Sequence, residues 1–195
     1  MVIEAPGRDN GNGPYGRRVY TFTLQGEAWA EDKILTASDG ASFDYFAGSI
    51  AISRDMLIVG DYRKYDFRGC AYMFVLSGDG SWDEGAGLII RNGIASGDRF
   101  GWSVALSGDR ALIGADESDE KGNDSGAAYI FHRVNGVRKE EAKLVPADGA
   151  SNYWFGYDVA LSGDTAIIGS PLDDDMGFNS GSVYVFGRRD DGTWE

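Results

Sequence analysis

One stretch decides the fold of this chain: Phe100-Gly101-Trp102-Ser103-Val104-Ala105-Leu106-Ser107-Gly108-Asp109. It recurs 55 residues later as Phe155-Gly156-Tyr157-Asp158-Val159-Ala160-Leu161-Ser162-Gly163-Asp164, and a degenerate copy occupies residues 46–55. Within each copy, apolar residues alternate with small or polar ones, which is the period of a β-strand and not of a helix. The Ser-Gly-Asp turn that ends both full copies is typical of a hairpin, because glycine tolerates a positive φ.

The residues after each copy complete a repeating unit. A second apolar run follows at 56–60, 110–115 and 165–171, and a small-aromatic segment follows a polar loop at 69–74, 126–131 and 181–186. A fourth segment, as in 137–145, closes the unit. Each unit therefore predicts four short strands. Tandem four-stranded units with a period of about 55 residues are typical of β-propeller blades.

These patterns predict an all-β chain that forms an arc of a β-propeller, with two complete blades, two partial blades and about 14 strands. The predicted boundaries are a partial blade at 1–45, blades at 46–99 and 100–154, and a partial blade at 155–195. A propeller ring typically needs about 4–8 blades. Two copies would lack a first strand at each join, so we expect either part of a longer chain or association with other blades.

Composition excludes several classes of protein. A formal net charge of −13 argues against nucleic-acid binding, which needs a basic face. No apolar run is long enough to insert into a membrane. Cys70 is the single cysteine, so no intrachain disulfide can form, and we expect it to be buried. His132 is the single histidine, which leaves little for a zinc site.

Acidic loops are the strongest sign of a site. They follow the second strand of the last two units, and a third polar segment lies at 8–13. Carboxylates on a glycine-bearing loop suit calcium, which takes about 6–8 oxygen ligands. The alternative is a solvated loop whose acids make turns through their own side chains. The candidate calcium ligands are Asp173, Asp174 and Asp175 in one loop and Asp116, Asp119 and Asp124 in the other.

The units resemble FG-GAP repeats, the blades of the integrin alpha-subunit head and of many bacterial and algal surface proteins. Phe100-Gly101 and Phe155-Gly156 match the first part of that motif, and Gly169-Ser170-Pro171 matches the second with one conservative change. Glu4-Ala5-Pro6 is similar to another copy of the second part. The resemblance implies a propeller that binds ligands through loops on one face. Integrin-like blades bind calcium through an Asp-x-Asp-x-Asp-Gly pattern, whereas the acids at 173–175 are consecutive.

The resemblance implies a non-catalytic module for cell adhesion, which binds a protein or a glycan outside the cell or at its surface, with calcium as the only expected cofactor. Two alternatives stay open: part of a propeller enzyme, a hydrolase or lyase with a central active site, and a purely structural repeat array. Aromatic residues lie close to the start of the predicted first strands, where they either stack on sugars or pack between blades. They are Trp102, Tyr153, Trp154 and Tyr157.

Overall fold

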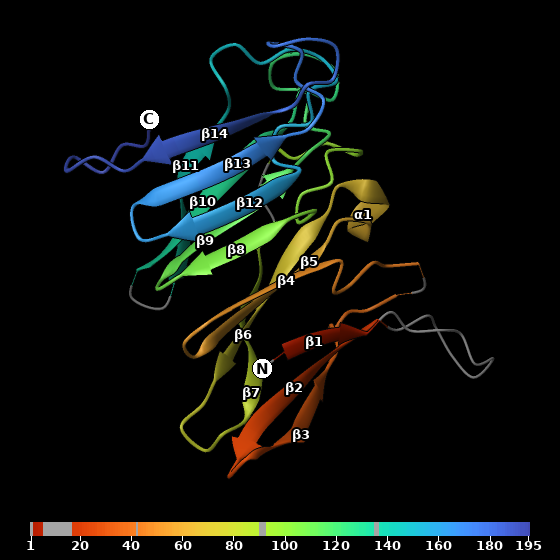
Figure 1. Ribbon diagram of the computed structural model, residues 1–195. Helices are drawn as coiled ribbons and strands as arrows, with labels where there is room; N and C mark the ends of the chain where they lie inside the picture. Colours follow the sequence, from red (N-terminus) through yellow and green to blue (C-terminus); the bar gives the residue numbers. More distant parts are fainter. Residues whose placement is uncertain (1, 6–16, 42, 90–92, 135–136) are drawn as a thin grey trace.

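A computed structural model describes residues 2–5, 17–41, 43–89, 93–134 and 137–195. These residues form four antiparallel β-sheets that follow one another along the chain and stack side by side (Figure 1). Two four-stranded sheets lie between two three-stranded ones. The predicted fold class, an all-β arc with two complete and two partial propeller blades, is therefore confirmed.

The described strands number 14 and belong to the four sheets in chain order. The first sheet holds β1 (Val2–Ala5), β2 (Arg18–Gln25) and β3 (Ala28–Leu35). The second holds β4 (Ser49–Ser53), β5 (Met56–Asp61), β6 (Cys70–Leu76) and β7 (Trp82–Ile89). The third holds β8 (Val104–Ser107), β9 (Arg110–Ala115), β10 (Ala127–Val134) and β11 (Val137–Leu144). The fourth holds β12 (Asp158–Ser162), β13 (Thr165–Ser170) and β14 (Ser182–Gly187).

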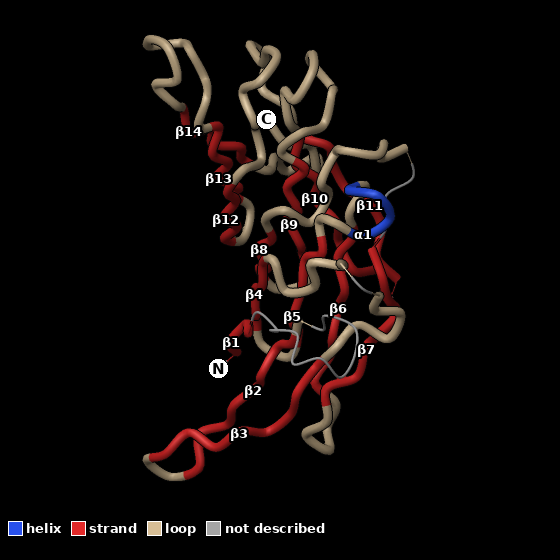
Figure 2. The backbone as a smooth tube through the Cα atoms, turned by 90° about the vertical axis from the view of Figure 1, so that its right-hand side faces the viewer, coloured by secondary structure: helices blue, strands red, loops and turns tan. Residues whose placement is uncertain are grey.

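Neighbouring strands in each sheet are consecutive in the chain, so every sheet is a simple meander. The first strands β4, β8 and β12 lie next to one another along one side of the stack, and β7 and β11 lie on the other side (Figure 2). This is the arrangement of propeller blades, whose first strands line the central axis. A single turn, α1 (Lys64–Phe67), interrupts the loop between β5 and β6. Among the described residues, no helix has the length and apolar character needed to cross a membrane.

The hydrophobic core lies between the sheets. Ile58 and Met73 of the second sheet share a buried cluster with Ile113 and Tyr129 of the third. A second cluster joins β9 and β10 to the fourth sheet through side chains such as Ile168. Each blade buries its apolar faces only by stacking on its neighbours, which is why the repeats occur in tandem.

Glycines allow neighbouring sheets to approach closely at two junctions. A Cβ atom built on Gly60 would overlap the carbonyl oxygen of Gly101 in the next blade, and one built on Gly114 would overlap the carbonyl oxygen of Gly156. Each of these carbonyls also accepts a hydrogen bond from the preceding blade, at 3.0 Å from Ser49 Oγ and 2.7 Å from Ser103 Oγ. The repeat therefore carries glycine at this position because the backbone of the next blade lies against it.

Burial along the strands shows which sheets are covered on both faces. Every residue of β5 is buried, and so are all residues of β9 except its first. In β13, buried positions alternate with exposed or partly exposed ones, and in β14, partly buried positions alternate with exposed ones. Because successive side chains point to opposite faces of a sheet, this alternation means that only one face of the fourth sheet is covered.

Candidate binding face

Two kinds of loop lie at one end of the sheets, which we call the loop end. They are the loops between second and third strands and the segments that lead into the first strands. Antiparallel pairing requires this, because a second strand ends where the first strand beside it begins. In the second sheet, Ser49 at the start of β4 pairs with Gly60 near the end of β5. In the fourth sheet, Asp158 pairs with Gly169 in the same way.

Aromatic rings form a continuous chain of contacts across the loop end. The ring centroids of Tyr45 and Tyr62 are 4.8 Å apart, and those of Tyr62 and Trp102 are also 4.8 Å apart. Trp102 lies 5.4 Å from Tyr157, which stacks on Trp154 at 6.1 Å with an interplanar angle of 9°. We call these five residues the aromatic row. The row links three successive blades, so its rings pack across the blade junctions.

Arginine side chains lie over the aromatic row. The guanidinium carbon of Arg17 is 3.3 Å from the ring centroid of Tyr45, and that of Arg63 is 4.7 Å from the same ring. The guanidinium of Arg99 lies 5.2 Å from the Trp102 centroid. Guanidinium groups at these distances are attracted by the negative face of the ring. The loop end thus combines ring surfaces and positive charge on a chain that is acidic overall.

Three of the four aromatic residues identified from the sequence belong to this row: Trp102, Trp154 and Tyr157. Tyr153 does not, and its backbone carbonyl accepts a hydrogen bond of 2.7 Å from Ser170. No sequence pattern indicated that Tyr45 and Tyr62 would continue the row. The packing of these rings between blades, one of the two alternatives, is confirmed by the contacts of Trp102 with rings on both sides.

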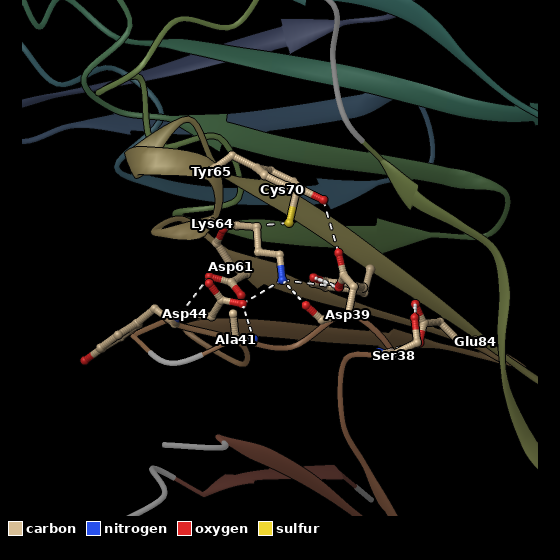
Figure 3. A network of polar contacts seen from close by, with 11 residues as sticks. Ser38, Asp39, Ala41, Asp44, Asp61, Lys64, Tyr65, Cys70 and Glu84 are labelled. Carbon is tan, nitrogen blue, oxygen red and sulfur yellow. Dashed lines mark hydrogen bonds and ion pairs between the residues drawn. The ribbon is translucent and has the colours of Figure 1, made fainter. Parts of the chain in front are cut away.

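A buried lysine occupies the loop of the second sheet (Figure 3). Nζ of Lys64 donates hydrogen bonds of 2.6 Å to the Asp39 carbonyl oxygen and 2.6 Å to Asp44 Oδ2. It also lies 3.3 Å from the carboxylate of Asp39, which accepts hydrogen bonds from the hydroxyls of Tyr72 and Tyr65. Segment 62–68 is basic in sequence, with Arg63, Lys64 and Arg68. In the structure, its lysine is itself the cation held by two carboxylates.

The charges of this network stabilise each other. Burial opposes the charge on Lys64, but the hydrogen bonds to Asp44 and Asp39 outweigh it and raise the lysine pKa. Burial likewise opposes the charge on Asp39, yet hydrogen bonds from Tyr72 and Lys64 lower the pKa of this carboxyl. Lys64 and Asp39 are therefore both ionised at neutral pH, and the ion pair fastens α1 to the segment before β4.

The carboxyl groups of Asp61 and Asp116, also at the loop end, are fully buried. Asp61 accepts a hydrogen bond of 2.7 Å from the backbone N–H of Tyr45, and burial raises its pKa to about 6. Asp116 accepts no hydrogen bond at either carboxylate oxygen from the residues that the structure describes. Nη1 of Arg99 lies 3.7 Å from Asp116 and 2.7 Å from Glu117. Burial raises the pKa of Asp116 to about 7, although Arg99 acts in the opposite direction.

The consecutive acids of the last loop have different partners. Asp173 is buried, and its carboxylate accepts hydrogen bonds of 2.6 Å from the Tyr184 hydroxyl and 2.9 Å from the backbone N–H of Asp175. Asp174 accepts one of 2.6 Å from the backbone N–H of Asn179. Asp175 is exposed, and the negative charge of Asp173 raises its pKa. Asp173 and Asp174 thus use carboxylate oxygens to hold the loop together.

The acids of the preceding loop behave similarly. Asp119 accepts a hydrogen bond of 2.9 Å from the backbone N–H of Asp124, whose own carboxylate accepts one from Asn123. Asp116 instead faces Arg99. In the part of the chain that the structure describes, no three acidic, histidine or cysteine side chains lie together in a way that could hold a metal ion. The assignment of these six aspartates as calcium ligands stays a prediction. Segment 8–13 and Pro6, which the sequence also singled out, lie outside the described residues.

The single cysteine, Cys70, and the single histidine, His132, both lie in β-strands. Cys70 is fully buried and unpaired, as expected, and burial raises the pKa of its thiol. His132 is half-buried in β10, where it pairs with Arg110 on one side and Lys139 on the other.

The repeat pattern also matches a known family. The model of the FG-GAP repeat matches three segments of the chain, residues 29–74, 82–131 and 139–186. The chain belongs to the FG-GAP repeat family. Each matched segment begins in the last strand of one sheet and ends in the third strand of the next sheet. No curated protein matches the sequence.

Proposed function

We propose that this FG-GAP chain is a non-catalytic binding module that recognises a ligand through the aromatic row and the arginines above it. The observation that carries the proposal is the unbroken series of ring contacts from Tyr45 to Trp154 at the loop end. Loops held by a rigid scaffold are where binding residues concentrate. The proposal includes a role in adhesion, outside the cell or at its surface.

The composition of this face favours a protein ligand. Tyrosine, tryptophan and arginine are enriched at the centres of protein interfaces, where they carry most of the binding energy. Such rings offer a large contact area at a small cost in side-chain entropy, and they are already held in place by each other. Sugars also stack on aromatic faces, so a glycan is the second outcome that the experiment distinguishes. The proposal does not depend on calcium.

The test compares Arg63→Ala and Trp102→Ala with Trp29→Ala in the binding of labelled chain to intact cells. Arg63 is exposed beside the row, and Trp102 lies at its centre. Trp29 is an exposed tryptophan in β3 that lies outside the aromatic row, so it is a matched control. Circular dichroism establishes that each variant is folded.

We expect the two row variants to lose binding by about tenfold or more, as for residues at an interface centre, while Trp29→Ala binds like the parent chain. Protease treatment of the cells should abolish binding, whereas periodate treatment should not. Loss after periodate alone would assign the ligand to glycans. Equal binding by all variants, or no binding to any cell, would overturn the proposal and favour a structural repeat array.

A further inference from the structure

The loop between β5 and β6 differs in charge from the corresponding loops of the next two sheets. Loop 62–69 contains three basic residues and one acidic residue. Loop 116–126 contains five acidic residues and one lysine, and loop 171–181 contains three acidic residues and no basic one. The positive charge of these three loops is therefore concentrated at one end of the aromatic row, at Tyr45 and Tyr62.

Two arginines from different segments meet at the ring of Tyr45. Arg17 lies just before β2, and Arg63 lies in the loop after β5, with guanidinium carbons 3.3 Å and 4.7 Å from the ring centroid. Among the described residues, neither arginine forms an ion pair with a carboxylate. Arg17 donates a hydrogen bond of 3.3 Å to the Ala47 carbonyl, and Arg63 lies within reach of the Tyr62 hydroxyl. Because each guanidinium group carries five N–H donors, the pair has donors to offer to an anion.

The turn that carries Arg63 has a strained backbone. Tyr65, Asp66 and Phe67 have φ angles of 55°, 60° and 57°, in the left-handed region that residues other than glycine rarely adopt. Each of the two corresponding loops contains one such residue, an aspartate or an asparagine, which are the types that tolerate this region best. Strain of this kind persists only where the surrounding structure holds it, and it is concentrated at binding sites.

Contacts from two neighbouring segments hold this turn in place. The hydrogen bonds of Lys64 join it to the segment before β4 (Figure 3). From the segment before β8, Ser96 Oγ donates a hydrogen bond of 2.7 Å to the Asp66 carbonyl, and the backbone N–H of Arg99 donates one of 2.9 Å to the Phe67 carbonyl. The turn is thus fixed before a ligand arrives, which reduces the entropy that binding costs.

We propose that the two guanidinium groups at Tyr45 bind carboxylate side chains of a protein ligand, so that an acidic segment of the ligand lies on this end of the aromatic row. A guanidinium group matches the two oxygens of a carboxylate and forms paired, charge-assisted hydrogen bonds with it. The rings of Tyr62 and Trp102 come next in the row and suit apolar side chains beside the acids. This inference rests on the proposed function and specifies the chemistry of its ligand.

A sulfated glycan fits this face less well than an acidic peptide segment. A polyanionic chain needs positive charge along its whole length, whereas the next loop along the row, 116–126, is acidic and exposes Asp119 and Glu120. Carboxylates repel a second anion over a distance of about 8 Å at physiological ionic strength. A short acidic segment needs positive charge only beside Tyr45.

The test follows the arginine Nε–Hε signals of the isotope-labelled full chain by NMR during titration with two capped peptides. One peptide has the sequence Glu-Glu-Trp-Leu, and its neutral twin has the sequence Gln-Gln-Trp-Leu. With the acidic peptide we expect saturable shifts of the signals of Arg17 and Arg63, and the neutral twin should bind at least about tenfold more weakly. Sodium chloride at about 0.5 M should weaken the binding of the acidic peptide, because salt screens the attraction.

Substitutions identify the groups that bind the acids. Arg17→Gln and Arg63→Gln should each weaken binding of the acidic peptide by about tenfold, since each removes one charged donor group. Arg63→Lys should restore only part of the affinity, because lysine keeps the charge but not the planar donor group. Arg54→Gln is the matched control, with the same change of charge at an exposed position in the turn between β4 and β5, away from the loop end.

Four results would overturn the proposal. Two of them are the absence of saturable shifts and equal affinity for the two peptides, which would mean that the rings bind without recognising charge. The third is an equal loss of affinity in the Arg54→Gln chain, which would assign the attraction to overall charge. The fourth is tighter binding of a heparin tetrasaccharide than of the acidic peptide at Arg17 and Arg63, which would assign the site to sulfated glycans.

The binding of labelled chain to intact cells separates this inference from the proposed function. If Trp102→Ala abolishes cell binding while Arg17→Gln and an excess of the acidic peptide do not reduce it, the aromatic row binds a ligand that is not acidic, and only this inference fails. If the acidic peptide binds as expected but the chain binds no cells, the carboxylate site is supported and the proposed function fails.

Discussion

Replacing Gly114 by alanine tests whether close approach of the backbones holds the blades together. A Cβ atom added to Gly114 would overlap the carbonyl oxygen of Gly156 and the hydroxyl of Ser103, and it would lie 3.1 Å from the Gly156 carbonyl carbon. The overlapping atoms of Gly156 belong to the backbone, so the clash can be relieved only if the two sheets move apart. No positive φ is involved at Gly114, which makes the effect steric alone.

Two losses set the size of the effect. Overpacking in a well-packed interior costs about 1–3 kcal/mol. Separation of the sheets also breaks the hydrogen bond of 2.7 Å from Ser103 to the Gly156 carbonyl, which contributes roughly 0.5–1.5 kcal/mol. Gly114→Ala should therefore destabilise the chain by about 2–4 kcal/mol, or lower the Tm by roughly 5–15 °C for a chain of this size.

Gly169→Ala is the matched control, because it introduces the same atom at the same position of the last blade. There the nearest atom is 3.7 Å away, an ordinary contact, and we expect a change within about 0.5 kcal/mol. Urea denaturation followed by circular dichroism measures both variants. Equal unfolding midpoints for Gly114→Ala and Gly169→Ala would refute the conclusion that backbone contact between blades determines the glycine in the repeat.

Three further perturbations probe the charges of the loop end. Burial raises the pKa of Asp116 to about 7 in the folded protein, which therefore binds this proton more tightly than the unfolded chain, and stability should fall as pH rises from about 4 to 7. Asp116→Asn should remove this pH dependence and raise the free energy of unfolding at pH 8 by roughly 1–3 kcal/mol, measured by urea titration. Lys64→Met should destabilise by about 2–4 kcal/mol, since it leaves two carboxylates without their cation, whereas Arg68→Met at an exposed position should have little effect in the same assay. Asp173→Ala should lower the Tm with or without calcium, because the hydroxyl of Tyr184 loses this acceptor, and millimolar calcium alone should not shift the Tm in scanning calorimetry. A rise of the Tm with calcium that Asp173→Ala abolishes would contradict the view that Asp173 only holds the loop together.

The fold could be predicted from the sequence because a propeller repeats its signals. The alternation around Val104 is weak evidence alone, but its recurrence around Val159 with the same turn makes a strand pair the consistent interpretation. The stacking of the sheets follows from the same residues, since a four-stranded unit with two apolar faces must be covered on both. The half-exposed last sheet could be predicted only as a partial blade, and its open face at Val185 became visible only in the structure.

The site was less predictable, because it depends on contacts between segments that are distant in sequence. Lys64 looks like a solvated charge in its own loop, and its burial depends on Asp39 and Asp44 from the segment before β4. The aromatic row similarly joins Tyr62 to Trp102 across a blade junction. The consecutive carboxylates at 173–175 are the opposite case, because they are adjacent in sequence. Their proximity suggested calcium ligands, which stays a prediction, and the structure adds local hydrogen bonds to the carboxylates of Asp173 and Asp174.

The offset between the sequence repeat and the sheets explains how the stack is held together. Residues 82–131 form one matched repeat, yet they include β7 of the second sheet and β8, β9 and β10 of the third. A change in one repeat therefore acts on two blades. The Phe-Gly segment lies between these two parts of the repeat and hydrogen-bonds to the preceding blade at Arg68. Blade order is thus determined twice, by the covalent connection and by the docking of Phe100 on Gly69.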